Sequence, residues 1–117
     1  MISGLKPKDR RKHEERLVRE HWQRLVAVGL SERSVPFELY FERYKLHAML
    51  RYGVLICVAN SLCVGGSDER RDNDGMLIAF LYSRLRAFMA DHGTPCEVWK
   101  RCHALAQSEA ESAVQVR

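Results

Sequence analysis

Histidines are the side chains in this sequence with the widest chemical range. His13 and His21 fall within about 80° of each other on a helix but lie two turns apart, and no third ligand accompanies them. A zinc site is therefore not expected. His47, His92 and His103 stand near no serine, cysteine or acidic residue in a spacing that indicates a nucleophile and its base. The sequence predicts no catalytic residue and no metal ligand.

Two short motifs resemble loops that bind phosphate or calcium. The pair Gly65-Gly66 lacks both the second glycine spacing and the Lys-Ser/Thr of a phosphate-binding loop. The run Asp72-Asn73-Asp74-Gly75 is similar to the acidic part of a calcium loop. However, Arg70 occupies the place of the first ligand and Leu81 the place of the closing glutamate. We interpret the first motif as a turn and the second as a helix cap.

The cysteines do not form a redox or metal-binding motif. They are Cys57, Cys63, Cys96 and Cys102, two pairs with a spacing of six residues and no Cys-x-x-Cys. On a helix this spacing points two thiols about 240° apart. The prediction is therefore free thiols, mostly buried.

Size and composition limit the class of protein. The chain has 117 residues, 46% of them hydrophobic and 29% charged, which is typical of one ordinary globular domain and not of a disordered chain. Its first residues lack the apolar core of a secretory signal. The longest apolar run, Gly53 to Ala59, is far shorter than the roughly 20 residues that span a bilayer. The sequence predicts a cytoplasmic protein without a membrane partner.

Glycine and proline divide the chain into four segments, all with helical periodicity. Gly29 and Gly93 stand where helices normally end, while Pro36 and Pro95 suit the first turn of a helix. The sequence predicts an all-α, four-helix bundle-like fold. Helices are expected at about 9–28, 36–64, 73–92 and 95–109, in one domain over 9–108, with a basic extension at 1–8 and a frayed tail at 109–117.

The second segment has an unusual apolar half. Leu50 to Cys63 is apolar nearly all round, which is typical of a helix buried on every side, although its β-branched residues leave a buried strand as an alternative. Arg51 and Asn60 interrupt the stretch and are expected to be paired, within the protein or with a ligand. Each large apolar side chain left in water forfeits roughly 1.5 to 3 kcal/mol. The other helices must therefore surround this segment, or a partner must cover it.

Positive charge is concentrated at the start of the chain. Residues 5–24 carry eight Lys or Arg and four Asp or Glu, which equals the formal net charge of +4 of the whole chain. Cations at a helix N-terminus are disfavoured by the macrodipole, so the cluster requires a reason. It is either a patch for an acidic surface or a solvated face paired with Glu14, Glu15 and Glu20. Nucleic acid is not favoured, because no recognition module accompanies the charges. The cluster consists of Lys6, Lys8, Arg10, Arg11 and Lys12.

Several short runs together suggest a family. They are Arg10-Arg11-x-x-Glu14, Leu17-Val18, Leu25 before Gly29, Tyr40-Phe41-Glu42-Arg43-Tyr44 and Leu50-Arg51-Tyr52-Gly53. In order and spacing they resemble the C-terminal helices of the aminoglycoside-phosphotransferase superfamily. The nearest branch is the ecdysteroid-kinase-like, or CHK-kinase-like, group. The resemblance extends from about Pro7 to Ala90.

The resemblance implies a kinase-like fold that transfers phosphate from ATP to a hydroxyl of a small molecule. The C-terminal helices would help to build the acceptor pocket, with Tyr40, Tyr44 and Arg51 facing it. The catalytic His-x-Asp loop, the metal-binding aspartate and the β-rich lobe have no counterpart here, so ATP and Mg²⁺ are implied only for a complete family member. The partner would be the missing catalytic lobe or a second copy. The alternative is a free-standing helical protein–protein interaction module with a basic N-terminal helix.

Overall fold

The protein is a chain of four helices that pack together, as the sequence predicts. The computed structural model describes residues 5–63 and 68–116, and describes side chains for 5–61 and 75–116. Over these residues it contains no strand. The apolar stretch is therefore helical, and the alternative of a buried strand is wrong. The helices are α1 Pro7–Ala27, α2 Phe37–Cys63, α3 Asp68–His92 and α4 Pro95–Gln115.

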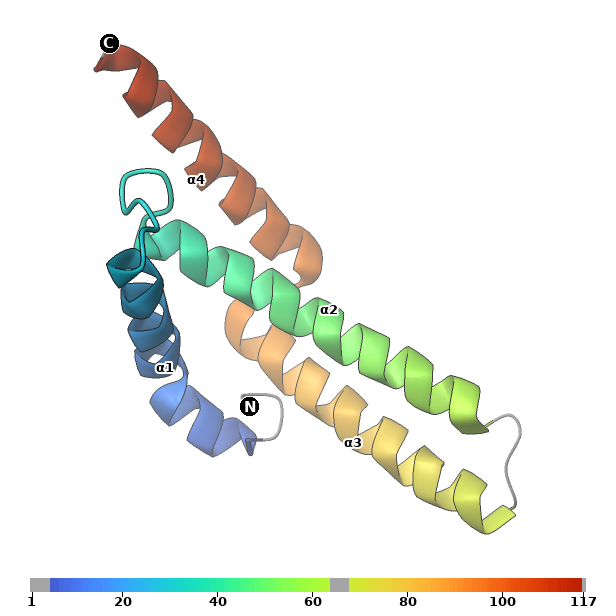
Figure 1. Ribbon diagram of the computed structural model, residues 1–117. Coiled ribbons are helices and arrows are strands. Elements are labelled where there is room, and N and C mark those ends of the chain that lie inside the picture. Colours follow the sequence, from blue (N-terminus) through green and yellow to red (C-terminus); the bar gives the residue numbers. More distant parts are fainter. Residues whose placement is uncertain (1–4, 64–67, 117) are drawn as a thin grey trace.

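The arrangement is elongated because two long helices form a projecting hairpin. In Figure 1, α2 and α3 run antiparallel, while α1 and α4 lie beside the amino-terminal half of α2. The radius of gyration is 17.8 Å, whereas a compact domain of about this size has a value of roughly 13 Å. The distal part of the hairpin, residues 50–63 and 68–82, is called the hairpin arm below. At the other end of the hairpin, α1 and α4 also pack against α2.

The helix ends follow local signals. Gly29 and Gly93 both have positive φ, 117° and 98°, which a glycine adopts without strain. Pro7 and Pro95 occupy the first turns of α1 and α4, where the missing N–H costs nothing. Thr94 caps α4, because its side chain accepts from the Glu97 amide while the Glu97 carboxylate accepts from the Thr94 amide. These signals explain why the predicted breaks near 29 and 93 are confirmed.

Three predicted boundaries differ from the structure. Helix α1 begins at Pro7, inside the expected extension. Helix α3 begins at Asp68 instead of 73, so the motif expected to cap it lies within the helix. Helix α4 continues to Gln115, where a frayed tail was expected from 109. The added stretches of α3, residues 68–72, and of α4, residues 109–115, lack proline and are rich in good helix formers. No local signal therefore stops either helix there.

The hydrophobic core lies where α2, α3 and α4 meet. Phe88 and Val98 are fully buried, and Tyr52 is 2% exposed. Tyr52 and Phe88 pack with ring centroids 6.2 Å apart, and Met49 and Leu81 complete the buried cluster. Helix α4 therefore adds Val98 to the core from its first turn and then continues beside the amino-terminal half of α2, where Arg101 pairs with Glu42.

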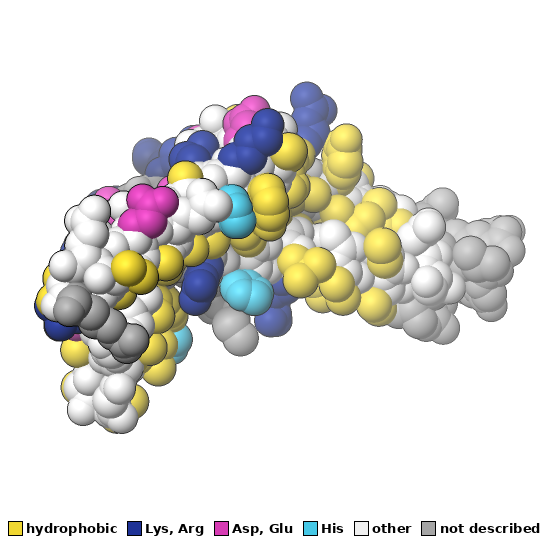
Figure 2. Space-filling view, turned by 90° about the horizontal axis from the view of Figure 1, so that it is seen from above, with side chains coloured by type: hydrophobic (Ala, Val, Ile, Leu, Met, Phe, Trp, Pro, Cys, Tyr) yellow, Lys and Arg dark blue, Asp and Glu magenta, His cyan; other side chains and the backbone are white. Residues whose placement is uncertain are grey.

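The expectation that the apolar half of α2 is buried on every side is wrong. Leu50, Val54 and Val58 are 64%, 52% and 52% exposed. We call these three residues the outer stripe. They recur every four residues on the side of α2 that faces away from α3, and Figure 2 shows hydrophobic side chains gathered along the arm. Over the described residues, no helix is long and apolar enough to span a membrane.

The polar residues and thiols of this region are also exposed. Arg51 and Asn60 are exposed, so the expectation that they are buried is wrong. The reason is that neither α1 nor α4 extends over this half of α2. Cys57 and Cys96 are exposed and Cys102 is half-buried; all three are free, but they are not mostly buried as expected. Cys63 lies outside the described side chains.

Candidate functional site

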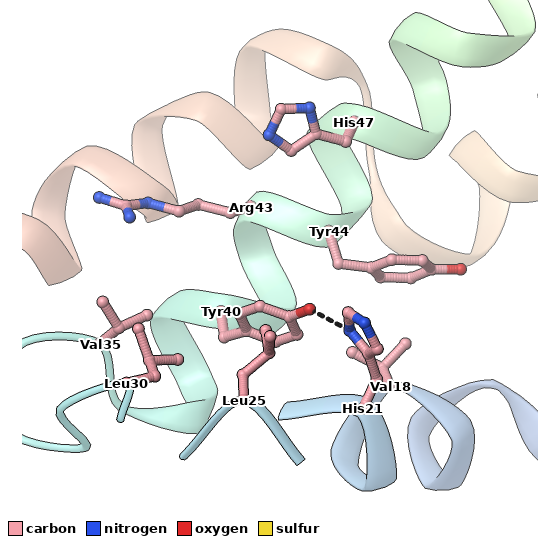
Figure 3. A pocket seen from close by; sticks show the side chains of 9 residues that line it. All are labelled: Val18, His21, Leu25, Leu30, Val35, Tyr40, Arg43, Tyr44 and His47. Atoms are coloured by element: carbon pink, nitrogen blue, oxygen red, sulfur yellow. Dashed lines mark hydrogen bonds between the residues drawn. The ribbon is translucent and has the colours of Figure 1, made fainter. Parts of the chain in front are cut away.

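A pocket of about 500 Å³ lies between α1 and α2 and is bordered by the loop that joins them (Figure 3). This volume is within the range of about 300–1,000 Å³ that small-molecule sites occupy. Most of its surface is apolar. The lining residues are Val18, His21, Leu25, Leu30, Val35, Tyr40, Arg43, Tyr44 and His47.

Helical periodicity brings these residues together. From α2 come Tyr40, Arg43, Tyr44 and His47, with the spacing i, i+3, i+4 and i+7 that places side chains on one face. From α1, Val18, His21 and Leu25 follow the same rule. The loop between the helices is held by the Trp22 indole, whose Nε1 donates to the Val35 carbonyl at 3.0 Å. The backbone amide of Leu30 donates to the Leu25 carbonyl at 2.9 Å.

The pocket has two polar regions. On one side, the Tyr40 hydroxyl and His21 Nδ1 share a hydrogen bond of 2.6 Å, drawn as a dashed line in Figure 3. Burial raises the pKa of Tyr40, so the phenol remains protonated at neutral pH. At the other side, the exposed residues Arg43 and His47 are one turn apart on α2. None of the nine lining residues is acidic.

A buried ionic cluster holds α1 against the rest of the molecule, next to the pocket. Arg10 and Glu14 are 2% and 4% exposed. Arg10 Nη1 donates to Glu14 at 2.8 Å, and its Nη2 pairs with Asp91 of α3. His92 Nε2 lies 2.7 Å from Glu14 Oε2, the same oxygen that accepts from Arg10, and the Tyr44 hydroxyl donates to Glu14 Oε1 at 2.7 Å. The cluster therefore connects three helices through one carboxylate.

This cluster accounts for part of the basic start of the chain. Arg10 and Arg11 both pair with Asp91, in the last turn of α3, so an acid from another helix offsets the unfavourable dipole of their own helix end. Further along α1, Arg16 pairs with Glu20 and Arg19 with Glu15 at i, i+4 spacing. The exposed cations left at the start of α1 are Lys6, Lys8 and Lys12.

The protonation states in the cluster follow from these contacts. Burial alone would raise the pKa of Glu14, but hydrogen bonds from His92 and Tyr44 and the nearby charges of His92 and Arg10 outweigh it and lower that pKa. Burial and the Glu14 carboxylate raise the pKa of Tyr44 far above its usual value. For Asp91, burial opposes but hydrogen bonds from Arg11 and Arg10 produce a lowered pKa. Both carboxylates are therefore ionised at neutral pH.

Acid should weaken the attachment of α1. Because the pKa of Glu14 is lower in the folded state than its ordinary value of 4.5, its contribution to stability is fully present above pH 4.5 and is lost as the pH falls through the folded-state pKa. We expect the urea concentration at the unfolding midpoint to decrease when the pH is lowered below 4.5. Measured at constant ionic strength, the fall should be smaller in Glu14→Gln, which has no carboxyl to titrate. An equal fall in both proteins would contradict the assignment.

The structure brings together two of the three residues that the sequence suggested for an acceptor pocket. Tyr40 and Tyr44 line the same pocket. Arg51 has nearly the same rotation on the helix as Tyr44 but lies two turns beyond it, where α1 no longer faces α2. His21 and Arg43 line the pocket although they were not among the suggested residues. The spacing of Arg43 from Tyr40 is a signal that would have found it.

Neither the residues nor the comparisons assign a cofactor. In the part of the chain that the structure describes, no group of three or more His, Cys, Asp or Glu residues is placed to hold a metal ion. No known protein family matches the sequence, and no curated protein or solved structure is significantly similar to it. The function therefore rests on the site itself and on the motifs quoted above.

Proposed function

We propose that this chain is the C-terminal helical part, on the acceptor-pocket side, of a small-molecule phosphotransferase with a kinase-like fold. The observation that carries the proposal is that Tyr40 and Tyr44, the tyrosines of the quoted Tyr-Phe-Glu-Arg-Tyr motif, share one partly open pocket. Its apolar walls suit an apolar acceptor, and the His21–Tyr40 pair offers both a donor and an acceptor to a hydroxyl.

The exposed outer stripe also supports the proposal. Leu50, Val54 and Val58 lie on a helix that carries one charged residue between Leu46 and Cys63, which is unusual for a solvated surface. Covering such side chains gains about 25 cal/mol for each Å² of apolar surface removed from water. A packed lobe of the same protein is one such cover.

This chain would bind and orient the acceptor rather than perform the chemistry. Phosphoryl transfer depends on metal ions and phosphate-binding groups held in position. The sequence has no His-x-Asp-x-x-x-x-Asn loop, so under this proposal another part of the protein would supply these groups. The contribution of these helices is a pocket with fixed walls, which places a hydroxyl without reacting with it.

The test is to sequence the transcript and the genomic DNA upstream of Met1 in all frames. An upstream β-rich segment with a His-x-Asp-x-x-x-x-Asn loop would support the proposal. Co-expression of that segment with this chain should then yield a complex in which the outer stripe is protected from hydrogen exchange. Unrelated sequence upstream would overturn the proposal and leave the second candidate.

The second candidate is a free-standing helical interaction module, which the outer stripe favours directly. The proposed partner is a second copy, because an uncharged apolar stripe is self-complementary across a twofold axis. Lys6, Lys8 and Lys12 would be available for an acidic surface on another protein.

For this candidate, Val54→Lys is the decisive variant. A charge in the centre of the stripe should convert a dimer to a monomer, because a desolvated, unpaired lysine opposes association. The measurement is molar mass by light scattering at several protein concentrations. Gln107→Lys, an equal charge change at an exposed position of α4, is the control and should leave the mass unchanged. A wild-type monomer at all concentrations would rule this candidate out.

A further inference from the structure

We infer that the pocket between α1 and α2 binds an apolar molecule that carries a carboxylate, with Arg43 as its counter-ion. The inference rests on the proposed function, which makes this pocket the acceptor site. It adds the chemical class of the acceptor. The distribution of charge around the pocket carries the inference.

The guanidinium of Arg43 is the fixed positive charge of the pocket. Among the side chains that the structure describes, no carboxylate lies within ion-pair distance of Arg43. Its neighbour Glu42 is engaged elsewhere, accepting from Lys45 at 2.7 Å and from Arg101 at 3.3 Å. The buried carboxylate on the far side of Tyr44, that of Glu14, is held by Arg10 and His92. Arg43 is thus free to pair with a ligand.

The polar edge and the apolar floor lie in one pocket. Arg43 and His47 project from successive turns of α2, while Val18 and Leu25 of α1 and the rings of Tyr40 and Tyr44 form the walls (Figure 3). An arginine presents a rigid fork of donors that matches a carboxylate. A ligand would place its carboxylate at this edge and its apolar body against the walls.

Alternative ligand classes fit less well. A cation would approach Arg43 and find no acidic residue among the lining residues. A strongly polar molecule would leave hydrogen-bonding groups unpaired against valine and leucine. A neutral apolar molecule would fill the pocket but would gain nothing from Arg43. These differences define three probes of equal chain length: decanoate, decanol and decylammonium.

The experiment measures binding of the three probes to the full chain, below their micelle concentrations. Trp22 reports on the pocket because its indole holds the Val35 loop, and Trp99→Phe removes the other tryptophan, which is 56% exposed on α4. We expect decanoate to bind about tenfold more tightly than decanol, as one charge-assisted hydrogen bond provides. Decylammonium should bind most weakly.

Two matched variants assign the preference to Arg43. Arg43→Gln should reduce decanoate affinity about tenfold, to that of decanol, and should change decanol affinity much less. Arg86→Gln, the same change at an exposed position of α3 outside the pocket, should keep the preference. Circular dichroism of each variant confirms that the helices are intact.

The outcomes separate the inference from the proposed function. Equal affinity for decanoate and decanol, or an unchanged preference in Arg43→Gln, would overturn the inference while leaving an apolar acceptor pocket. Binding of none of the probes would also overturn it. The proposed function itself is decided by the upstream sequence, so either can fail while the other stands.

Discussion

Replacing Glu14 by alanine should lower the free energy of unfolding by about 3–5 kcal/mol at neutral pH, because it breaks a buried ion pair by removing one partner. Glu14 is 4% exposed and accepts from Arg10 and Tyr44, with His92 at 2.7 Å. Without it, the Arg10 guanidinium remains buried with Asp91 as its carboxylate partner, and the Tyr44 hydroxyl loses its acceptor. An unsatisfied buried donor costs about 1–3 kcal/mol by itself.

The measurement is urea denaturation followed by circular dichroism, with Glu15→Ala as the matched control. Glu15 is the next residue on α1 and pairs with Arg19, but its side chain is 65% exposed. Exposed pairs contribute about 0.2–1 kcal/mol, so the control should remain close to wild type. If Glu14→Ala and Glu15→Ala lose similar stability, the cluster does not hold α1 in place.

Local features of the fold could be predicted from the sequence, whereas the contacts of the buried ionic cluster could not. The breaks at Gly29 and Gly93 and the four helices follow from signals within a few residues, so local reasoning found them. The pairing of Arg10 with Asp91 joins residues 81 positions apart. No local pattern specifies that contact, and the sequence showed only that the basic cluster required a partner.

The apolar half of α2 illustrates a second limit. Composition predicted that Leu50 to Cys63 needs cover, but it cannot show which side of the helix the rest of the chain leaves open. The answer depends on where α1 and α4 end, and both lie beside the amino-terminal half of α2. The outer stripe follows from that tertiary arrangement, as does the exposure of Arg51.

The pocket could be predicted only in part. Tyr40 and Tyr44 are one turn apart, so their common face was predictable from spacing alone. That α1 forms the opposite wall was not, because it depends on the loop of residues 28–36 and on the Trp22 contact with Val35. From the sequence, His21 is considered as a zinc ligand, whereas its hydrogen bond with Tyr40 places it at a polar region of the pocket.

Phe88→Ala should be as destabilising as the loss of Glu14, for a different reason. Phe88 is fully buried and packs against the rings of Tyr52 and His92, at centroid distances of 6.2 Å and 4.6 Å, and the Arg10 guanidinium lies 4.9 Å from its ring centroid. Truncating a buried phenylalanine costs about 3–5 kcal/mol through lost transfer energy and the cavity left behind. The whole free energy of unfolding of a small domain is only about 5–15 kcal/mol.

The control is Phe80→Ala, on the same helix two turns earlier. Phe80 is 45% exposed, and its ring lies 4.6 Å from the Arg84 guanidinium carbon, so its removal leaves no enclosed cavity. We expect a loss of about 1 kcal/mol or less there. In urea denaturation, Phe88→Ala should shift the midpoint strongly and Phe80→Ala slightly. Similar losses would mean that the stability of the protein is spread along the hairpin arm and is not concentrated where α1, α2, α3 and α4 meet.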